Sequence, residues 1–167
     1  MKVSSCIAAD DWLTGDSAAC AASTTDNLFN DPNYSAQKWV YDLMNVEPVW
    51  RQGITGKGVM VRVNDPDGVD PTIKELWGRF DESASCPTYL PPEIPPGENT
   101  TVEHGTVVAT IALGWADNGV CAAGIAHGAT LSACLGPLAA QDEDVARFLL
   151  DGLETTDISI NSWYIPS

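Results

Sequence analysis

The sequence is poor in basic residues. Lysine and arginine number 8 against 23 aspartates and glutamates, which gives a formal net charge of −15. This balance argues against a nucleic-acid-binding surface, which needs clustered positive charge. The chain also lacks any run of about 18 apolar residues, so the sequence predicts no membrane-spanning helix. Repeats, heptads and blocks of like charge are absent too, and the 167 residues suffice for one domain with a single core.

The amino-terminal segment lacks the apolar stretch of a working signal peptide, although it carries Lys2. Residues 1–27 consist mainly of alanine, serine, threonine and aspartate with little periodicity. We therefore expect a disordered leader or linker over 1–27 and a folded domain over 28–167.

Cysteine occurs five times, an odd number. In an oxidising compartment one cysteine would stay unpaired, as truncation through a disulfide would produce. In a reducing compartment the same side chains would be buried thiols. The sequence leaves both interpretations open.

Strand and helix patterns alternate along the chain. The expected elements are strands at 59–63, 130–135 and 157–162, a helix from His104 to about Gly114 and a helix from Asp142. Such alternation predicts an α/β fold in which a parallel sheet is flanked by helices. Five prolines over 86–101 predict an irregular surface loop.

A histidine and an aspartate stand where one fold can bring them together. His104 opens a helix and is followed by Gly105-Thr106, and Asp65 ends the first strand. Because the helix start disfavours an imidazolium, a carboxylate is needed to fix the tautomer of a general base there and to stabilise its cation. Two other interpretations remain open: a histidine that only caps a helix, and Asp67 as the acid in place of Asp65.

Six short motifs follow one another in a distinctive order. They are Asn30-Asp31-Pro32, 53–59 (GITGKGV), His104-Gly105-Thr106, Asn118-Gly119-Val120-Cys121, Gly124-Ile125-Ala126 and Asn161-Ser162-Trp163. In this order they resemble the subtilisin-like serine endopeptidases, in particular the kexin and furin branch of the proprotein convertases. The resemblance covers about Asn30 to Trp163. It implies that 28–167 form the N-terminal half of a peptidase domain, with an incomplete subtilisin-like parallel sheet.

The resemblance assigns catalytic and substrate-binding roles. Asp65 and His104 match the family's catalytic aspartate and histidine, although the turn after Asp65 is one residue longer than the usual Asp-x-Gly. Asp67 would contact a basic substrate side chain, and Ser162 and Trp163 would lie on the strand that pairs with the substrate backbone.

The family's nucleophile lies in a Gly-Thr-Ser segment, which this chain lacks. Its only Gly-Thr pair, at 105–106, is followed by Val107. We therefore expect a chain truncated before the serine, inactive alone, whose partners are a peptide substrate and the missing C-terminal half of the domain.

The resemblance also implies a structural Ca²⁺ site built from side-chain and backbone oxygens, the ligands that Ca²⁺ prefers. The implied ligands are the side chains of Asp31, Glu75 and Asn118 and the backbone carbonyls of Trp115, Val120 and Ala122. The alternative is a helix-start aspartate, a solvated glutamate and an ordinary Asn-Gly turn. The resemblance further implies that Cys121 pairs with a cysteine in the later half of the domain.

Two functions follow as hypotheses. The first is a fragment of a calcium-dependent subtilisin/kexin-like serine endopeptidase of the secretory pathway or cell exterior, whose full-length form is tethered to a membrane or free. The second is a non-catalytic, truncated pseudo-peptidase that binds peptide or calcium.

Overall fold

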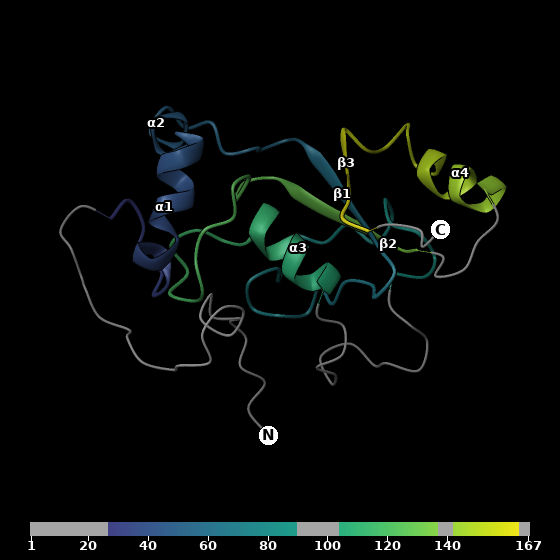
Figure 1. Cartoon of the computed structure of the whole chain (residues 1–167), viewed down its shortest axis with the longest axis horizontal. Helices are drawn as coiled ribbons and strands as arrows, with labels where there is room; N and C mark the ends of the chain where they lie inside the picture. The colour runs from purple at the N-terminus through teal and green to yellow at the C-terminus, as the bar shows by residue number, and fades with distance from the viewer. Residues whose placement is uncertain (1–26, 90–103, 137–141, 164–167) are drawn as a thin grey trace, which may run out of the picture.

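The computed structural model describes residues 27–89, 104–136 and 142–163, which surround a three-stranded parallel sheet (Figure 1). The elements are, in chain order, α1 (Tyr34–Met44), α2 (Glu47–Trp50), β1 (Met60–Asp65), α3 (His104–Leu113), β2 (Thr130–Leu135), α4 (Asp142–Leu150) and β3 (Ile158–Asn161). The α/β class that the sequence predicted is confirmed. The expected leader and residues 90–101 of the proline-rich loop lie outside the described residues.

The sheet has the strand order β2-β1-β3, so β1 is its central strand. Val63 of β1 is in register with Ala133 on one side and Ile160 on the other. Because all three strands run in parallel, their carboxyl ends meet at one edge of the sheet. Asp65 is the last residue of β1, so its side chain lies at that edge.

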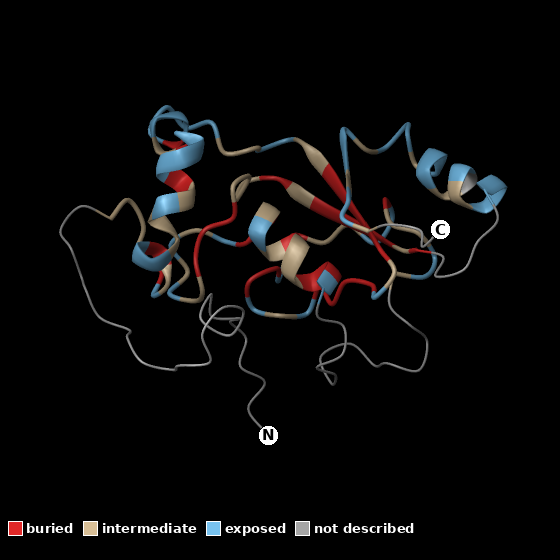
Figure 2. Cartoon of the chain, in the orientation of Figure 1, coloured by how far each residue is buried: buried red, intermediate tan, exposed pale blue. Residues whose placement is uncertain are grey.

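One face of the sheet packs against α3 and forms the main core. Its buried members come from the strands, from α3 and from the segments before and after α3: Val61, Val63, Val69, Leu76, Ala109, Leu113, Ala129, Leu131 and Ala133. Figure 2 shows β1 and β2 largely buried, whereas α1 and α4 at the two ends of the molecule are largely exposed. Within the described ranges no helix is long and apolar enough to cross a bilayer.

The aromatic residues before β1 form a second core. Tyr34, Tyr41 and Trp50 are at most 5% exposed and pack around Ala123. The Tyr41 hydroxyl donates a hydrogen bond to the Ala123 carbonyl at 2.7 Å, and the Trp50 indole N–H donates to the Ile125 carbonyl at 2.9 Å. These bonds fix α1 and α2 against the segment that follows α3.

Two cysteines on separate segments form a disulfide. Cys86, in the segment after β1, is bonded to Cys134 on β2, with 4.9 Å between their Cα atoms. Cys121 is disulfide-bonded as well. Its partner lies outside the described residues, so the pairing that the resemblance implies for Cys121 stays a prediction.

Candidate functional site

Asp65 is held rigidly at the end of β1. Its side chain is 1% exposed, and its backbone carbonyl accepts hydrogen bonds from the N–H groups of Gly68 and Gly136. Its Oδ1 accepts a third bond from the Asp67 N–H at 3.0 Å. Despite the extra residue in this turn, backbone N–H groups therefore hold both the main chain of Asp65 and one oxygen of its carboxylate.

The other oxygen of Asp65 faces the histidine. Oδ2 lies 2.7 Å from Nδ1 of His104, the first residue of α3. With the proton on Nδ1, the lone pair of Nε2 is left to accept another, and the imidazole is 45% exposed. The structure thus brings together the two residues that the sequence paired across 39 positions. Their catalytic role stays a prediction.

The two residues after His104 explain why α3 can start so close to Asp65. The Thr106 hydroxyl accepts a hydrogen bond from the Asp70 N–H at 2.9 Å. A Cβ atom on Gly105 would overlap the Gly68 carbonyl oxygen and would lie 2.6 Å from Cβ of Asp65. Only glycine allows this approach, because the atoms it would meet are backbone or the root of a buried side chain.

We expect Gly105→Ala to destabilise the fold and to separate the histidine from the aspartate. Overpacking of a buried contact of this kind costs about 1–3 kcal/mol. Urea unfolding followed by tryptophan fluorescence measures the change relative to the wild type. A Gly105→Ala variant as stable as the wild type would contradict the close approach described here.

The three predicted substrate-binding residues lie at different places around the dyad. Asp67 is exposed, and one of its carboxylate oxygens lies within 4.8 Å of ligand atoms of Asp65 and His104. Ser162 is exposed and directly follows β3, the edge strand of the described sheet. Trp163 packs against Phe148 of α4, with 6.1 Å between ring centroids. The structure therefore puts Asp67 beside the histidine.

Asp31 organises a turn that lies after α3. Its side chain is buried, and its two oxygens accept hydrogen bonds from the N–H groups of Asp117, Asn118 and Gly119 at 2.8–3.1 Å. Asp31 therefore binds the turn directly in this structure and is not merely the start of a helix.

Glu75 lies beside the same turn and is fully buried. Its Oε2 accepts a hydrogen bond from Nδ2 of Asn118 at 2.9 Å, and its Oε1 is buried without a partner among the described residues. Burial raises the pKa of Glu75 from 4.5 to about 7, and the nearby charge of Asp31 acts in the same direction. The alternative of a solvated glutamate is wrong.

These groups fit a cation. Two buried acidic side chains lie together, and one carboxylate oxygen lacks the partner that a buried charged group needs. Asn118 presents its amide nitrogen to Glu75, because its oxygen accepts a bond from the Val120 N–H at 2.8 Å. The Trp115 N–H donates a hydrogen bond to the backbone carbonyl of Glu75 at 3.1 Å, and the Ala122 N–H bonds its carboxylate. Cation binding would thus need the Asn118 amide to turn.

Arg79, which no sequence motif indicated, lies close enough to Glu75 for the two charges to interact. Its guanidinium stacks on the Trp115 ring, 3.6 Å from the centroid, and it donates hydrogen bonds to the carbonyls of Ala129 and His127. Burial lowers the pKa of Arg79 to about 10. No motif marks such an arginine, because all its partners are backbone groups or aromatic rings.

His127 takes no part in the dyad. Its ring packs edge-on against Phe29 and Trp50, and burial lowers its pKa.

The chain is similar to proprotein convertases and to furin-like and PC3-like endoproteases. The chain is 36% identical over 113 residues to rat proprotein convertase subtilisin/kexin type 4, an alignment that covers 64% of the chain and 16% of the relative. It is 34% identical over 154 residues to furin-like protease 1, isoform 1-CRR, of Drosophila melanogaster, covering 87% of the chain and 13% of the relative. With PC3-like endoprotease variant B of Hydra vulgaris it shares 34% over 152 residues, covering 83% of the chain and 21% of the relative.

The matched region is a small part of each relative, since 21% is the largest share among these three. No protein-family model matches the chain.

Proposed function

By sequence the chain is a member of the kexin/furin-like branch of the subtilisin-like endopeptidases, and on that premise we propose that it carries the aspartate and histidine of a serine endopeptidase. The observation that supports this proposal is the 2.7 Å contact between Asp65 and His104. The serine would come from the rest of the peptidase domain, because this chain contains no Gly-Thr-Ser segment.

In the proposed mechanism Asp65 and His104 have separate roles. Asp65 accepts the Nδ1–H bond and holds His104 in the tautomer whose Nε2 can take a proton from a serine hydroxyl. Attack by that serine on a peptide carbonyl forms an acyl-enzyme, and the imidazolium, stabilised by Asp65, returns the proton to the departing amine. Water then releases the acyl group.

We place a Ca²⁺ ion beside Glu75 in the same proposal. Asp31, Glu75 and the oxygen of Asn118 would hold it, together with carbonyls of Trp115, Val120 and Ala122. Bound Ca²⁺ would neutralise the two buried carboxylates and fix the turn after α3. It would take no part in the chemistry.

The proposed substrate is a peptide or protein segment. Asp67 would attract a basic side chain next to the dyad, because it is exposed and acidic there. The strand that ends at Ser162 and Trp163 would pair with the substrate backbone. The named relatives support a place in protein processing, and we propose the secretory pathway as its compartment.

Restoring the missing nucleophile tests this function. The chain alone is expected to show no turnover of a peptide ester. Fused to the downstream part of the Drosophila furin-like protease 1, which we expect to supply the serine, it should turn the ester over, and His104→Ala in that fusion should remove the activity. A folded fusion without activity would favour the second hypothesis, a non-catalytic binding module.

A further inference from the structure

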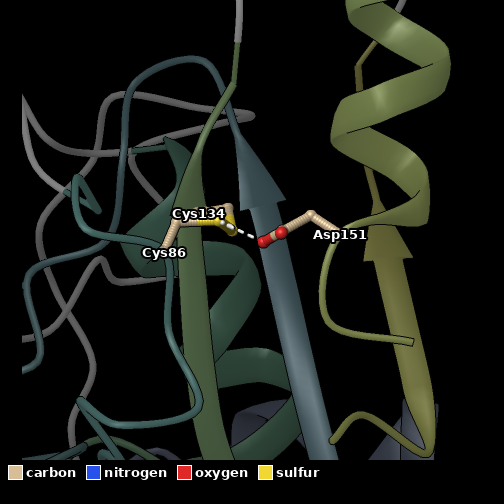
Figure 3. Close-up of side chains that lie close together, drawn as sticks. All are labelled: Cys86, Cys134 and Asp151. Atoms are coloured by element: carbon tan, nitrogen blue, oxygen red, sulfur yellow. Dashed lines mark hydrogen bonds between the residues drawn. A yellow bond between two sulfur atoms is a disulfide. The ribbon is translucent and has the colours of Figure 1, made fainter. Parts of the chain in front are cut away.

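Three metal-ligand atoms converge near the carboxyl end of β2, where Cys134 is in register with Asn64, the residue before Asp65 on β1. They belong to Cys86, Cys134 and Asp151, and they all lie within 4.8 Å of one another. Figure 3 shows the Asp151 carboxylate, from the segment after α4, pointing at the disulfide between the two cysteines. Its Oδ2 lies 3.1 Å from Sγ of Cys86. A disulfide sulfur carries no proton, so this is a contact between two electron-rich atoms.

The segments that carry these atoms are held together by bonds other than the disulfide. Arg62 on β1 donates to the carbonyl of Ala84, two residues before Cys86, and to the carbonyl of Asp151, both at 2.6 Å. The Cys86 N–H donates to the carbonyl of Ala133, the neighbour of Cys134, at 3.0 Å. These three bonds would keep the donor atoms close after the sulfur–sulfur bond is broken.

The charges around the site balance for a divalent cation. Two thiolates and the Asp151 carboxylate carry −3 together, and the Arg62 guanidinium, 3.2 Å from Asp151 Oδ2, carries +1. A divalent cation adds +2 and brings the total charge of these groups to zero. Without the metal, two thiolates and a carboxylate this close together would repel one another. A metal that favours thiolate is therefore the natural occupant.

We propose that the reduced form of this chain binds a thiophilic divalent cation such as Zn²⁺ through Cys86, Cys134 and Asp151. A dithiol reductant first gives two electrons and two protons to the disulfide, which yields two thiols, and is itself oxidised to a disulfide. The cation then replaces the two thiol protons, which are released. A water completes a four-coordinate site, as in zinc sites with three protein ligands.

The size and access of the site suit this ion. Zinc–sulfur bonds of about 2.3 Å place two sulfurs of a tetrahedral site about 3.8 Å apart, a separation that the two cysteine side chains can reach after reduction from Cα atoms 4.9 Å apart. Cys134 is fully buried, whereas the Asp151 side chain is 56% exposed. The cation can thus enter from solvent on the Asp151 side.

Metal titration in both redox states tests the proposal. The probe is Co²⁺, whose charge-transfer absorption reports thiolate ligands, followed by displacement with Zn²⁺. The chain is reduced with a phosphine, which takes up water oxygen to become the phosphine oxide while the disulfide becomes two thiols. We expect about one thiolate-bound Co²⁺ per reduced wild-type chain and none per oxidised chain. The reduced Cys86→Ser variant should lose this binding.

The carboxylate ligand is tested separately. Asp151→Asn should weaken Co²⁺ binding by at least about tenfold, whereas Asp144→Asn, at an exposed aspartate on α4, should leave it unchanged. The Arg62 bond to the backbone carbonyl of residue 151 remains in Asp151→Asn, so the segment should stay in place. Equal binding by Asp151→Asn and wild type would overturn the three-ligand site. Binding by reduced Cys86→Ser equal to wild type, or reduction that unfolds the chain beyond rescue by Zn²⁺, would overturn it as well.

Discussion

Asp65→Asn is expected to lower kcat/KM about 10⁴-fold in the fusion that restores the serine, while the fold remains intact. The physical reason is the 2.7 Å contact with Nδ1 of His104. An amide in that position can donate a hydrogen bond to Nδ1, which favours the tautomer with the proton on Nε2, and that tautomer cannot take the serine's proton. The neutral amide also fails to stabilise the imidazolium.

Two other substitutions make the comparison specific. Asp42→Asn, on the exposed face of α1, should leave kcat/KM unchanged, because Asp42 pairs with Lys38 and the dyad lies elsewhere. Asp67→Asn should raise KM for basic substrates more than it lowers kcat, because Asp67 has no bond to His104 among the described residues. If Asp67→Asn abolished turnover and Asp65→Asn did not, Asp67 would be the catalytic acid and the assignment made here would be wrong.

The sequence predicted the elements whose residues alternate or repeat in a regular way. The strand at 130–135 and the starts of the helices at His104 and Asp142 agree with the structure. The expected strand at 59–63 was too short, because β1 continues through Asn64 and Asp65. Asn64 is buried where its amide donates hydrogen bonds to Ser159 and Asn161 on β3. A pattern of apolar residues does not reveal such a contact.

Among the contacts between distant segments, the one between Glu75 and Asn118 was accessible only through family resemblance. Glu75 and Asn118 are 43 positions apart, and the resemblance proposed them as neighbours before the structure placed them 2.9 Å apart. The Cys86–Cys134 disulfide spans 48 residues and was not predicted, because five cysteines permit many pairings and their spacing favours none. Arg62 was missed for a similar reason, since its partners are carbonyls of segments far along the chain.

The stability of the chain without calcium is expected to fall as the pH rises from about 5 to 8, and Glu75→Gln should remove much of that fall. In the unfolded chain Glu75 loses its proton near pH 4.5, whereas in the folded chain burial holds its pKa at about 7. Between these values the folded state binds more protons than the unfolded state, so the free energy of unfolding decreases with pH. The shift corresponds to a loss of up to about 3 kcal/mol above pH 7.

Calcium should reverse this trend in the wild type alone. Above pH 7 the ionised Glu75 and Asp31 would both be available as ligands, and Ca²⁺ at 100 times its Kd would add about 2.7 kcal/mol to the free energy of unfolding. The stability of Glu75→Gln should respond much less to Ca²⁺, because the substitution removes the negative charge while it keeps the shape of the side chain. Urea unfolding at pH 5, 6, 7 and 8, with a chelator or with Ca²⁺, measures both effects.

Glu82→Gln is the matched control, because it makes the same change at an exposed glutamate of the segment between β1 and α3. Its pH and calcium dependence should follow the wild type. Parallel pH curves for Glu75→Gln and wild type without calcium would show that the buried carboxylate does not hold its proton in the folded chain. A calcium response that survives in Glu75→Gln would move the ion to other residues. The two outcomes separate the titration of Glu75 from its role as a ligand, so each part of the proposal for this cluster can fail independently.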